Sequence, residues 1–325
     1  MTPQIARRLL FSMKRIRSVE ETIAARYAEQ KMRCPTHLST GQEAVAAAVG
    51  AVLRRDDLAV SGHRAHAHYL AKGGSLPAMI AEIYGKAAGC AGGIGGSMHL
   101  VDEAAGFMGS TAIVAGTVPV GIGLAYAMKL KRTDQVSCVF MGDAVAEAGV
   151  FFESVNLAVL KQLPVLFVCE NNLYSVYSPL VVRQPQGREI HRVAAAMGLA
   201  SAHGDGNDAL GVYQMVKEGV RAIRAGGGPR FYEFATYRWR EHCGPLYDND
   251  IGYRSKAEFE SWKTREPIGR LERALLDDRA LTRADIATMD RDIAQEVEQA
   301  FAFAESSPYP PAEAAVAHVY ARSLG

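Results

Sequence analysis

Hydrophobic positions near the N-terminus recur at helical spacing. They are Ile5, Leu9, Leu10, Met13, Ile16 and Val19. Because this spacing places them on one face of a helix, it predicts an amphipathic first helix. The stretch before Glu20 is Arg-rich and acid-poor, as transit peptides are, but its pattern continues into the next helical segment. We therefore interpret it as part of the folded protein, and residues 1–55 are predicted to be helical with a break at Gly41.

The pattern changes at about Leu58, where short apolar runs begin to alternate with helical segments. Residues 136–142 and 163–170 are rich in Val, Phe and Cys and are bounded by polar or turn residues, which is typical of buried parallel strands. The helical spacing of 151–161 between them predicts a right-handed crossover, and 228–238 is predicted to be a later strand. From Ser255 the spacing predicts a helical tail, interrupted by Pro-Tyr-Pro-Pro before a last short helix.

These elements predict an α/β fold, a parallel sheet flanked by helices with helical N- and C-terminal extensions. We expect a single domain over 1–325, made of a helical segment (1–55), an α/β core (56–240), and an active-site loop with a helical tail (241–325). The 325 residues, 49% of them hydrophobic, are enough to bury such a core.

Charge and cysteine usage narrow the function classes. The formal net charge is +1, from 36 basic and 35 acidic residues, so nothing indicates nucleic acid as a partner. No apolar run approaches the ~20 residues of a membrane span. The five cysteines form no Cys-x-x-Cys pair, which argues against a disulfide framework and favours a cytoplasmic location.

Polar residues follow two neighbouring predicted strands. Asp143 comes directly after the first strand and Asn172 after the second. The carboxyl ends of parallel strands are where ligands bind. A carboxylate and an amide oxygen there suit Mg²⁺, and the helices that follow would offer N–H groups to a phosphate. A Gly-Asp pair alone is a common turn. The second Gly-Asp-Gly, at 204–206, lacks an Asn-Asn pair at the right distance and is interpreted as a turn.

Residues 142–176 resemble the thiamine-diphosphate motif, in which Gly-Asp-Gly is followed at a set distance by Asn-Asn. The motif in this chain resembles the form found in the alpha subunits of thiamine-diphosphate-dependent 2-oxo acid dehydrogenases. Segments 37–50, 61–74, 92–129 and 234–255 resemble the same family, so the resemblance covers nearly the whole chain. It implies the thiamine-diphosphate-binding fold, with thiamine diphosphate and Mg²⁺ as cofactors.

The resemblance also implies roles for individual residues. Mg²⁺ would be held by Asp143, Asn172 and the main-chain carbonyl of Tyr174. Ala144 stands where the family usually has Gly, and a left-handed conformation there would cost roughly 1–2 kcal/mol. His63 stands where the family usually has Tyr. The residues implied to contact the cofactor are His63, Arg64, Ala104, Ala112, Val114, Asp143, Ala144, Val145, Asn172, Tyr174 and His242. The implied active-site histidines, which suit proton transfer near neutral pH, are His37, His66 and His242.

Two other interpretations of these segments are weaker. The histidines of 63–68 alternate by two, which would place them on one face of a strand, but no Cys or Glu nearby completes a zinc site. The glycine-rich run at 92–96 lacks both standard nucleotide-binding patterns.

The family's Gly-His-Ser is Glu241-His242-Cys243 here, so the serine that some relatives phosphorylate is absent. The charges of Arg240 and Glu241 beside His242 hint at an unusual substrate or acceptor.

The resemblance implies a separate beta subunit, which carries the glutamate that activates the cofactor, in an α₂β₂ heterotetramer. The leading interpretation is decarboxylation of a 2-oxo acid such as pyruvate with acyl transfer to a lipoyl-bearing acyltransferase, or cleavage of acetoin. The second is a carboligase or lyase that passes the intermediate to an aldehyde. The third is a non-catalytic scaffold subunit.

Overall fold

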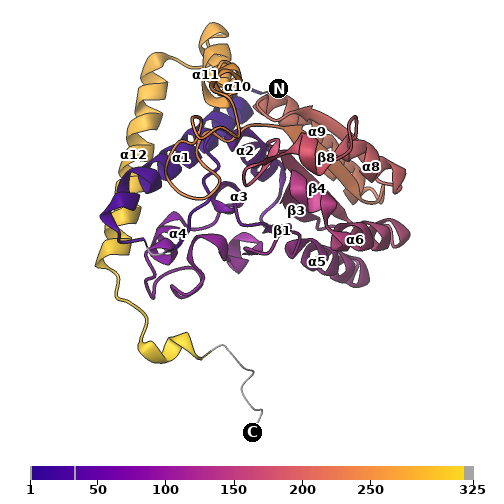
Figure 1. Cartoon of the computed structure of the whole chain (residues 1–325), viewed down its shortest axis with the longest axis horizontal. Coiled ribbons are helices and arrows are strands. Elements are labelled where there is room, and N and C mark those ends of the chain that lie inside the picture. Colours follow the sequence, from indigo (N-terminus) through magenta and orange to yellow (C-terminus); the bar gives the residue numbers. More distant parts are fainter. Residues whose placement is uncertain (1, 33, 318–325) are drawn as a thin grey trace.

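The computed structural model describes residues 2–32 and 34–317, and a single six-stranded sheet runs through its middle (Figure 1). All neighbouring strands of this sheet pair in parallel, in the order β2-β1-β3-β4-β8-β7. The strands are β1 (Leu58–Ser61), β2 (Phe107–Ser110), β3 (Ser137–Gly142), β4 (Val165–Asn171), β7 (Ala200–Asp205) and β8 (Arg230–Ala235). The predicted parallel sheet flanked by helices is confirmed.

Helices cover both faces of the sheet. The α-helices are α1 (Pro3–Arg26), α2 (Glu43–Val52), α3 (His66–Lys72), α4 (Leu76–Ile83), α5 (Thr117–Lys131), α6 (Gly149–Leu160), α7 (Leu180–Arg183), α8 (Ile190–Ala196), α9 (Ala209–Arg224), α10 (Lys256–Lys263), α11 (Pro267–Asp277) and α12 (Arg283–Ser306). The shorter elements are the 3₁₀ helices η1 (Tyr27–Glu29), η2 (Gly96–Met98), η3 (Glu103–Ala105), η4 (Asp143–Glu147) and η5 (Ala312–Ala315), and the hairpin of β5 (Tyr174–Ser175) with β6 (Ser178–Pro179).

The central strands are apolar on both faces because each face is covered by helices. Phe140 and Val168 pack into a core shared with α1, α2, α4, α9, α11 and α12. Their neighbours Val139 and Phe167 point the other way, into a core shared with α5, α6 and α8. This is why β3 and β4 have continuous apolar sequences rather than alternating ones.

The two predicted helical ends lie side by side. The apolar face of α1 packs in the same core as the buried face of α12, and the two helices run next to each other at the left of Figure 1. Arg15 and Glu296 add an ion pair of 2.6 Å across this contact. Such partly exposed pairs contribute little, so burial of the apolar faces is what holds the ends together.

Three local predictions need revision. The histidines of 63–68 do not share a strand, because β1 ends at Ser61 and α3 begins at His66. The turn predicted at 204–206 begins later, because β7 continues in register with β8 through Asp205 and Ala235. The last short helix is represented by η5, and residues 318–325 lie outside the described residues.

None of the helices in the described part of the chain combines the length and apolar character needed to cross a membrane.

Candidate active site

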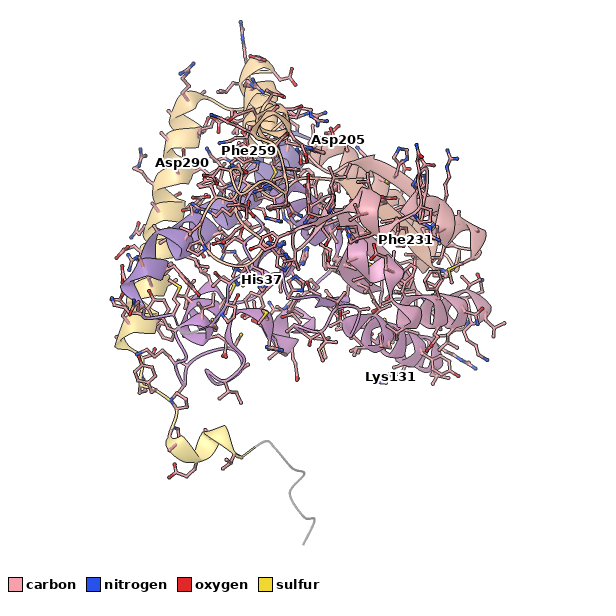
Figure 2. All side chains as sticks on the ribbon, in the orientation of Figure 1. His37, Lys131, Asp205, Phe231, Phe259 and Asp290 are labelled. Atoms are coloured by element: carbon pink, nitrogen blue, oxygen red, sulfur yellow. The ribbon has the colours of Figure 1, made fainter. Side chains whose placement is uncertain are left out.

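A cavity opens at the carboxyl ends of β1, β3 and β4, and residues from six separate segments line it. This is the edge at which ligands bind in parallel sheets. Figure 2 shows His37, a neighbour of this cavity, near the middle of the molecule, between the N-terminal helices and the sheet. The sequence-predicted site residues that line the cavity are His63, Arg64, Val114, Asp143, Ala144, Val145, Asn172, Tyr174 and His242.

The other predicted site residues lie elsewhere. Ala104 and Ala112 are exposed and do not line the cavity, and the carbonyl of Ala104 accepts a hydrogen bond from Arg55 at 3.1 Å. His66 is completely buried, with its Nε2 2.7 Å from the Ser97 hydroxyl. His37 does not line the cavity itself, but its ring contacts two histidines that do.

The strand ends bring Asp143 and Asn172 together. Gly142 pairs with Glu170 in the β3–β4 register, so the residues that follow each strand are neighbours. Asn172 Oδ1 accepts from the Tyr174 N–H at 3.2 Å, and its Nδ2 is 3.2 Å from Gln42 Oε1. The adjacent Asn171 instead donates to Glu233, so Asn172 is the member of the Asn-Asn pair that faces the cavity.

The buried Asp143 carboxylate already has a cationic neighbour. Burial raises the pKa of Asp143, and the Arg183 guanidinium, which forms an ion pair with it, acts in the opposite direction. Arg183 comes from α7 and also pairs with Glu147. A carboxylate this buried needs a positive partner, and a divalent cation would satisfy the same requirement.

Ala144 introduces no backbone strain. It belongs to η4, which begins at Asp143, and its φ is not positive, so the cost of a left-handed alanine does not arise. Positive φ occurs instead at Leu173 (73°) and Val176 (55°), on either side of Tyr174. Non-glycine residues adopt this region at a cost of roughly 1–2 kcal/mol. The strain therefore lies in the loop that carries the Tyr174 carbonyl.

Arg64 presents a positive charge to this cavity. Its guanidinium donates to two main-chain carbonyls, those of Leu38 at 2.5 Å and His242 at 3.2 Å. Among the described residues it forms no ion pair. Burial lowers the pKa of Arg64 to about 10, so it stays charged at neutral pH. A fixed guanidinium held by carbonyls and facing a cavity is suited to bind an anion such as a phosphate.

Three histidines gather beside Arg64. The ring centroids are separated by 4.5 Å between His37 and His63, by 5.0 Å between His37 and His242, and by 5.4 Å between His63 and His242. Burial, and then the charge of Arg64, lower the pKa of all three rings, to about 2 for His37, about 4 for His63 and about 3 for His242. The three imidazoles are therefore neutral at physiological pH.

Comparison with known proteins identifies the family of this chain. Residues 11–313 match the family model described as the dehydrogenase E1 component. The chain belongs to the dehydrogenase E1 component family. It is 36% identical over 315 residues to the chloroplastic pyruvate dehydrogenase E1 component subunit alpha-3 of Arabidopsis thaliana, which covers 95% of this chain and 73% of that protein.

Two further relatives are matched over most of their own length. The pyruvate dehydrogenase E1 component subunit alpha of Rickettsia bellii is 34% identical over 305 residues, covering 94% of this chain and 92% of the relative. The one from Porphyra purpurea is 36% identical over 301 residues, covering 90% and 86%. The chain is thus an alpha subunit of a thiamine-diphosphate-dependent 2-oxo acid dehydrogenase, as its sequence predicted.

In this E1 chain the loop that carries His242 is fixed by buried charges. The Asp248 carboxylate accepts hydrogen bonds from the side chains of Arg238, Tyr253 and Arg254. The N–H of Gly244 donates to the carbonyl of Thr36 at 2.8 Å, which brings the loop against the segment before α2. These contacts place His242 beside His37.

The charges that flank His242 point away from the cavity. Arg240 pairs with Glu21 on α1, and the Glu241 carboxylate accepts from the N–H of Leu246 at 2.9 Å. Neither residue lines the cavity. The hint of an unusual substrate that these charges gave in the sequence therefore has no counterpart in the site.

Sequence reasoning missed a buried polar chain in the wall of the cavity. His68 Nε2 lies 3.1 Å from Glu170, its Nδ1 lies 2.8 Å from the Ser61 hydroxyl, and its ring stacks on Phe140 at 3.9 Å. All four residues line the cavity. The available signal was that Glu170 directly precedes the Asn-Asn pair and that His68 closes the run of alternating histidines.

The neutral histidines make stability depend on pH. Their folded-state pKa values lie below the value of about 6.5 in an unfolded chain, so acid protonates the unfolded state first. The stabilisation is complete above about pH 6.5 and is lost as the pH falls toward 4 and below. We expect the free energy of unfolding, measured with urea between pH 8 and 5, to fall with acid, and the fall to be shallower in His37→Asn by up to about 1.4 kcal/mol per pH unit.

His203→Gln is the control for this series, because His203 stacks on His191 outside the cavity. Its pH dependence should match that of the unmodified chain. A His37→Asn profile as steep as the unmodified one would contradict the assignment of a neutral, buried His37.

Proposed function

We propose that this chain holds thiamine diphosphate and Mg²⁺ in its cavity and, together with a beta subunit, decarboxylates a 2-oxo acid such as pyruvate and passes the acyl group to a lipoyl-bearing acyltransferase. The observation that carries the proposal is the pairing of charges in one cavity. Arg64 lacks a counter-ion there among the described residues, while the buried Asp143 carboxylate depends on a cation.

The residues present fit both cofactors. Asp143, Asn172 and the carbonyl of Tyr174 are the oxygen ligands proposed for Mg²⁺, a hard ion that also takes phosphate oxygens. Arg64 would bind the diphosphate, with His63 and His242 as further hydrogen-bond donors to its oxygens. When bound, thiamine diphosphate supplies the nucleophile and the electron sink for loss of CO₂ from a 2-oxo acid.

The chain's own groups would position and shield the reaction. Arg64 stays charged in a partly buried place, so it can fix a diphosphate without titrating. His37 and His242 are neutral and can each exchange a proton or donate a hydrogen bond at a ring nitrogen. The apolar side chain of Val118 lines the same cavity, is buried, and would limit access of water there.

The pairing of the acidic side chains in the cavity supports an active site that is shared with a second subunit. Among the described lining residues the carboxylates are Asp143, which pairs with Arg183, and Glu170, which pairs with His68. Neither is free to activate the cofactor, so we propose that the beta subunit provides that glutamate. Large apolar side chains such as Ile113 (71% exposed) and Leu246 (65% exposed) are unburied in this chain, and a partner that covers them would complete an α₂β₂ heterotetramer.

The test is calorimetric titration of thiamine diphosphate with Mg²⁺ into the chain, alone and with its co-purifying partner. We expect tight binding only in the complex. Asp143→Ala should weaken it at least ~100-fold, because it removes the charged metal ligand. Asp290→Ala, which changes an exposed carboxylate on α12, should bind as the unmodified chain does.

Substrate assays on the same complex separate the related activities. Turnover of pyruvate with a lipoyl acceptor would support the proposal. Turnover only of acetoin would replace the proposed substrate, and turnover only with an aldehyde acceptor would replace the proposed acceptor. No cofactor binding even with the partner present would contradict the proposal and favour a non-catalytic subunit.

A further inference from the structure

Histidines from three separate segments meet at one wall of the cavity, and we propose that they form a binding site for a divalent transition-metal ion such as Zn²⁺. His37 lies between α1 and α2, His63 follows β1, and His242 follows β8. Each offers a ring nitrogen, and these nitrogens all lie within 4.8 Å of one another. The inference concerns the chain without thiamine diphosphate, because His63 and His242 are also proposed to contact that cofactor.

The geometry is close to that of a three-histidine metal site. Zinc binds imidazole nitrogen at about 2.0–2.1 Å, so ligands at the corners of a tetrahedron stand roughly 3.4 Å apart. Rotations of the imidazole side chains would close the remaining gap. Because His63 and His242 line the cavity, the fourth position opens into it and would be available to water or to an anionic oxygen.

The free ring nitrogen of His37 points to a ligand. Its Nδ1 is buried and has no hydrogen-bond partner among the described residues. A buried polar atom without a partner costs about 1–3 kcal/mol. Buried histidines outside the cluster bond through at least one ring nitrogen, as His68 does to Glu170 and His66 to Ser97, although the Nδ1 of His66 also has no hydrogen-bond partner among the described residues. A metal ion would satisfy the nitrogen that the fold leaves unpaired.

Protonation and charge also bear on the site. Metal binding requires neutral imidazole, and the three rings are neutral at pH 7. Arg64 lies beside the cluster, 3.2 Å from the carbonyl of His242, and its charge opposes a second cation. An anionic fourth ligand would reduce this repulsion because Arg64 can contact it too.

The donor atoms distinguish this site from the one at the strand ends. Asp143 and Asn172 offer oxygen, which suits Mg²⁺, whereas the three histidines offer nitrogen, which suits Zn²⁺ and Co²⁺. His63 completes the cluster, and the family usually has Tyr at that position. The site is therefore a property of this chain rather than of the family pattern.

Cobalt provides a direct test, because tetrahedral Co²⁺ has a strong visible absorption that six-coordinate Co²⁺ lacks. The full chain, purified without thiamine diphosphate, is titrated with Co²⁺ in excess Mg²⁺ at pH 7.5. We expect one Co²⁺ per chain with the tetrahedral spectrum and displacement by Zn²⁺. His63→Tyr and His242→Asn should each weaken binding at least ~10-fold, since each removes one ligand.

Two further variants complete the test. Asp143→Ala and His203→Gln should bind Co²⁺ as the unmodified chain does, and the circular dichroism of every variant should match that of the unmodified chain. The proposed site would be overturned if His63→Tyr and His242→Asn both bound Co²⁺ as tightly as the unmodified chain. It would also be overturned if Asp143→Ala lost Co²⁺ binding, or if binding saturated without the tetrahedral spectrum. None of these results would decide whether the cavity binds thiamine diphosphate, which is measured separately.

Discussion

Glu82→Ala is expected to lower the free energy of unfolding by more than about 4 kcal/mol and to release the glycine-rich segment that follows α4. The Glu82 carboxylate is completely buried and accepts four main-chain N–H groups at 2.7–3.0 Å. Each of these half-buried donors would lose a charged acceptor, and a donor left without a partner costs about 1–3 kcal/mol. The donors are those of Ala91, Gly93, Gly95 and Gly96.

Amide hydrogen exchange of those four residues distinguishes a local effect from a global one. In the unmodified chain they should exchange slowly, and in Glu82→Ala they should exchange faster than the sheet does. Glu103→Ala, which removes an exposed glutamate at η3, is the matched control and should change neither stability nor exchange. Slow exchange of the four amides in Glu82→Ala would show that the carboxylate does not hold the segment.

Gly41→Ala is expected to destabilise the chain by about 2–5 kcal/mol and to disturb the segment that carries His37. Gly41 has a φ of 98°, which costs an alanine roughly 1–2 kcal/mol. An added Cβ would also lie 2.6 Å from the carbonyl oxygen of Tyr237 and 2.6 Å from the ring of Trp239. Overpacking of this kind typically costs 1–3 kcal/mol.

Urea unfolding measures the loss, and the fluorescence of Trp239 reports the local change, with Trp262 as the other tryptophan of the chain. Gly123→Ala is the contrasting variant. Gly123 lies in α5 with open space around its Cα and no positive φ, so alanine should stabilise the helix by up to about 1 kcal/mol. If Gly41→Ala proved as stable as Gly123→Ala, the close approach of Gly41 to Trp239 would be refuted.

These two expectations concern the same feature of the molecule. The cavity is built on parallel strands, whereas the glycine-rich segment, the His242 loop and the segment before α2 are each held in place by a single group. Glu82 anchors the glycine-rich segment, Asp248 anchors the loop that carries His242, and Gly41 permits the close contact with Trp239. A buried polar anchor is costly to lose because its partners become unsatisfied together.

Three of the six strands, β3, β4 and β8, were predicted because their signal is local, whereas β1, β2 and β7 were not predicted. A strand covered by helices on both faces must be apolar at every position, as Val139, Phe140, Phe167 and Val168 are. The neighbouring placement of Asp143 and Asn172 followed from one crossover between adjacent strands. The first helix was predictable for the same reason, since its apolar face follows the helical period.

The sequence by itself therefore determined the sheet, the family and the strand-end residues of this protein. Only the tertiary structure decided that His37, His63 and His242 share one wall, that Arg183 pairs with Asp143, and that His66 is buried away from the cavity. The physical reason is the distance along the chain over which each kind of information acts. Periodicity reports which face of an element is buried, whereas contacts between side chains on different loops depend on how the loops cross, and no local pattern encodes that.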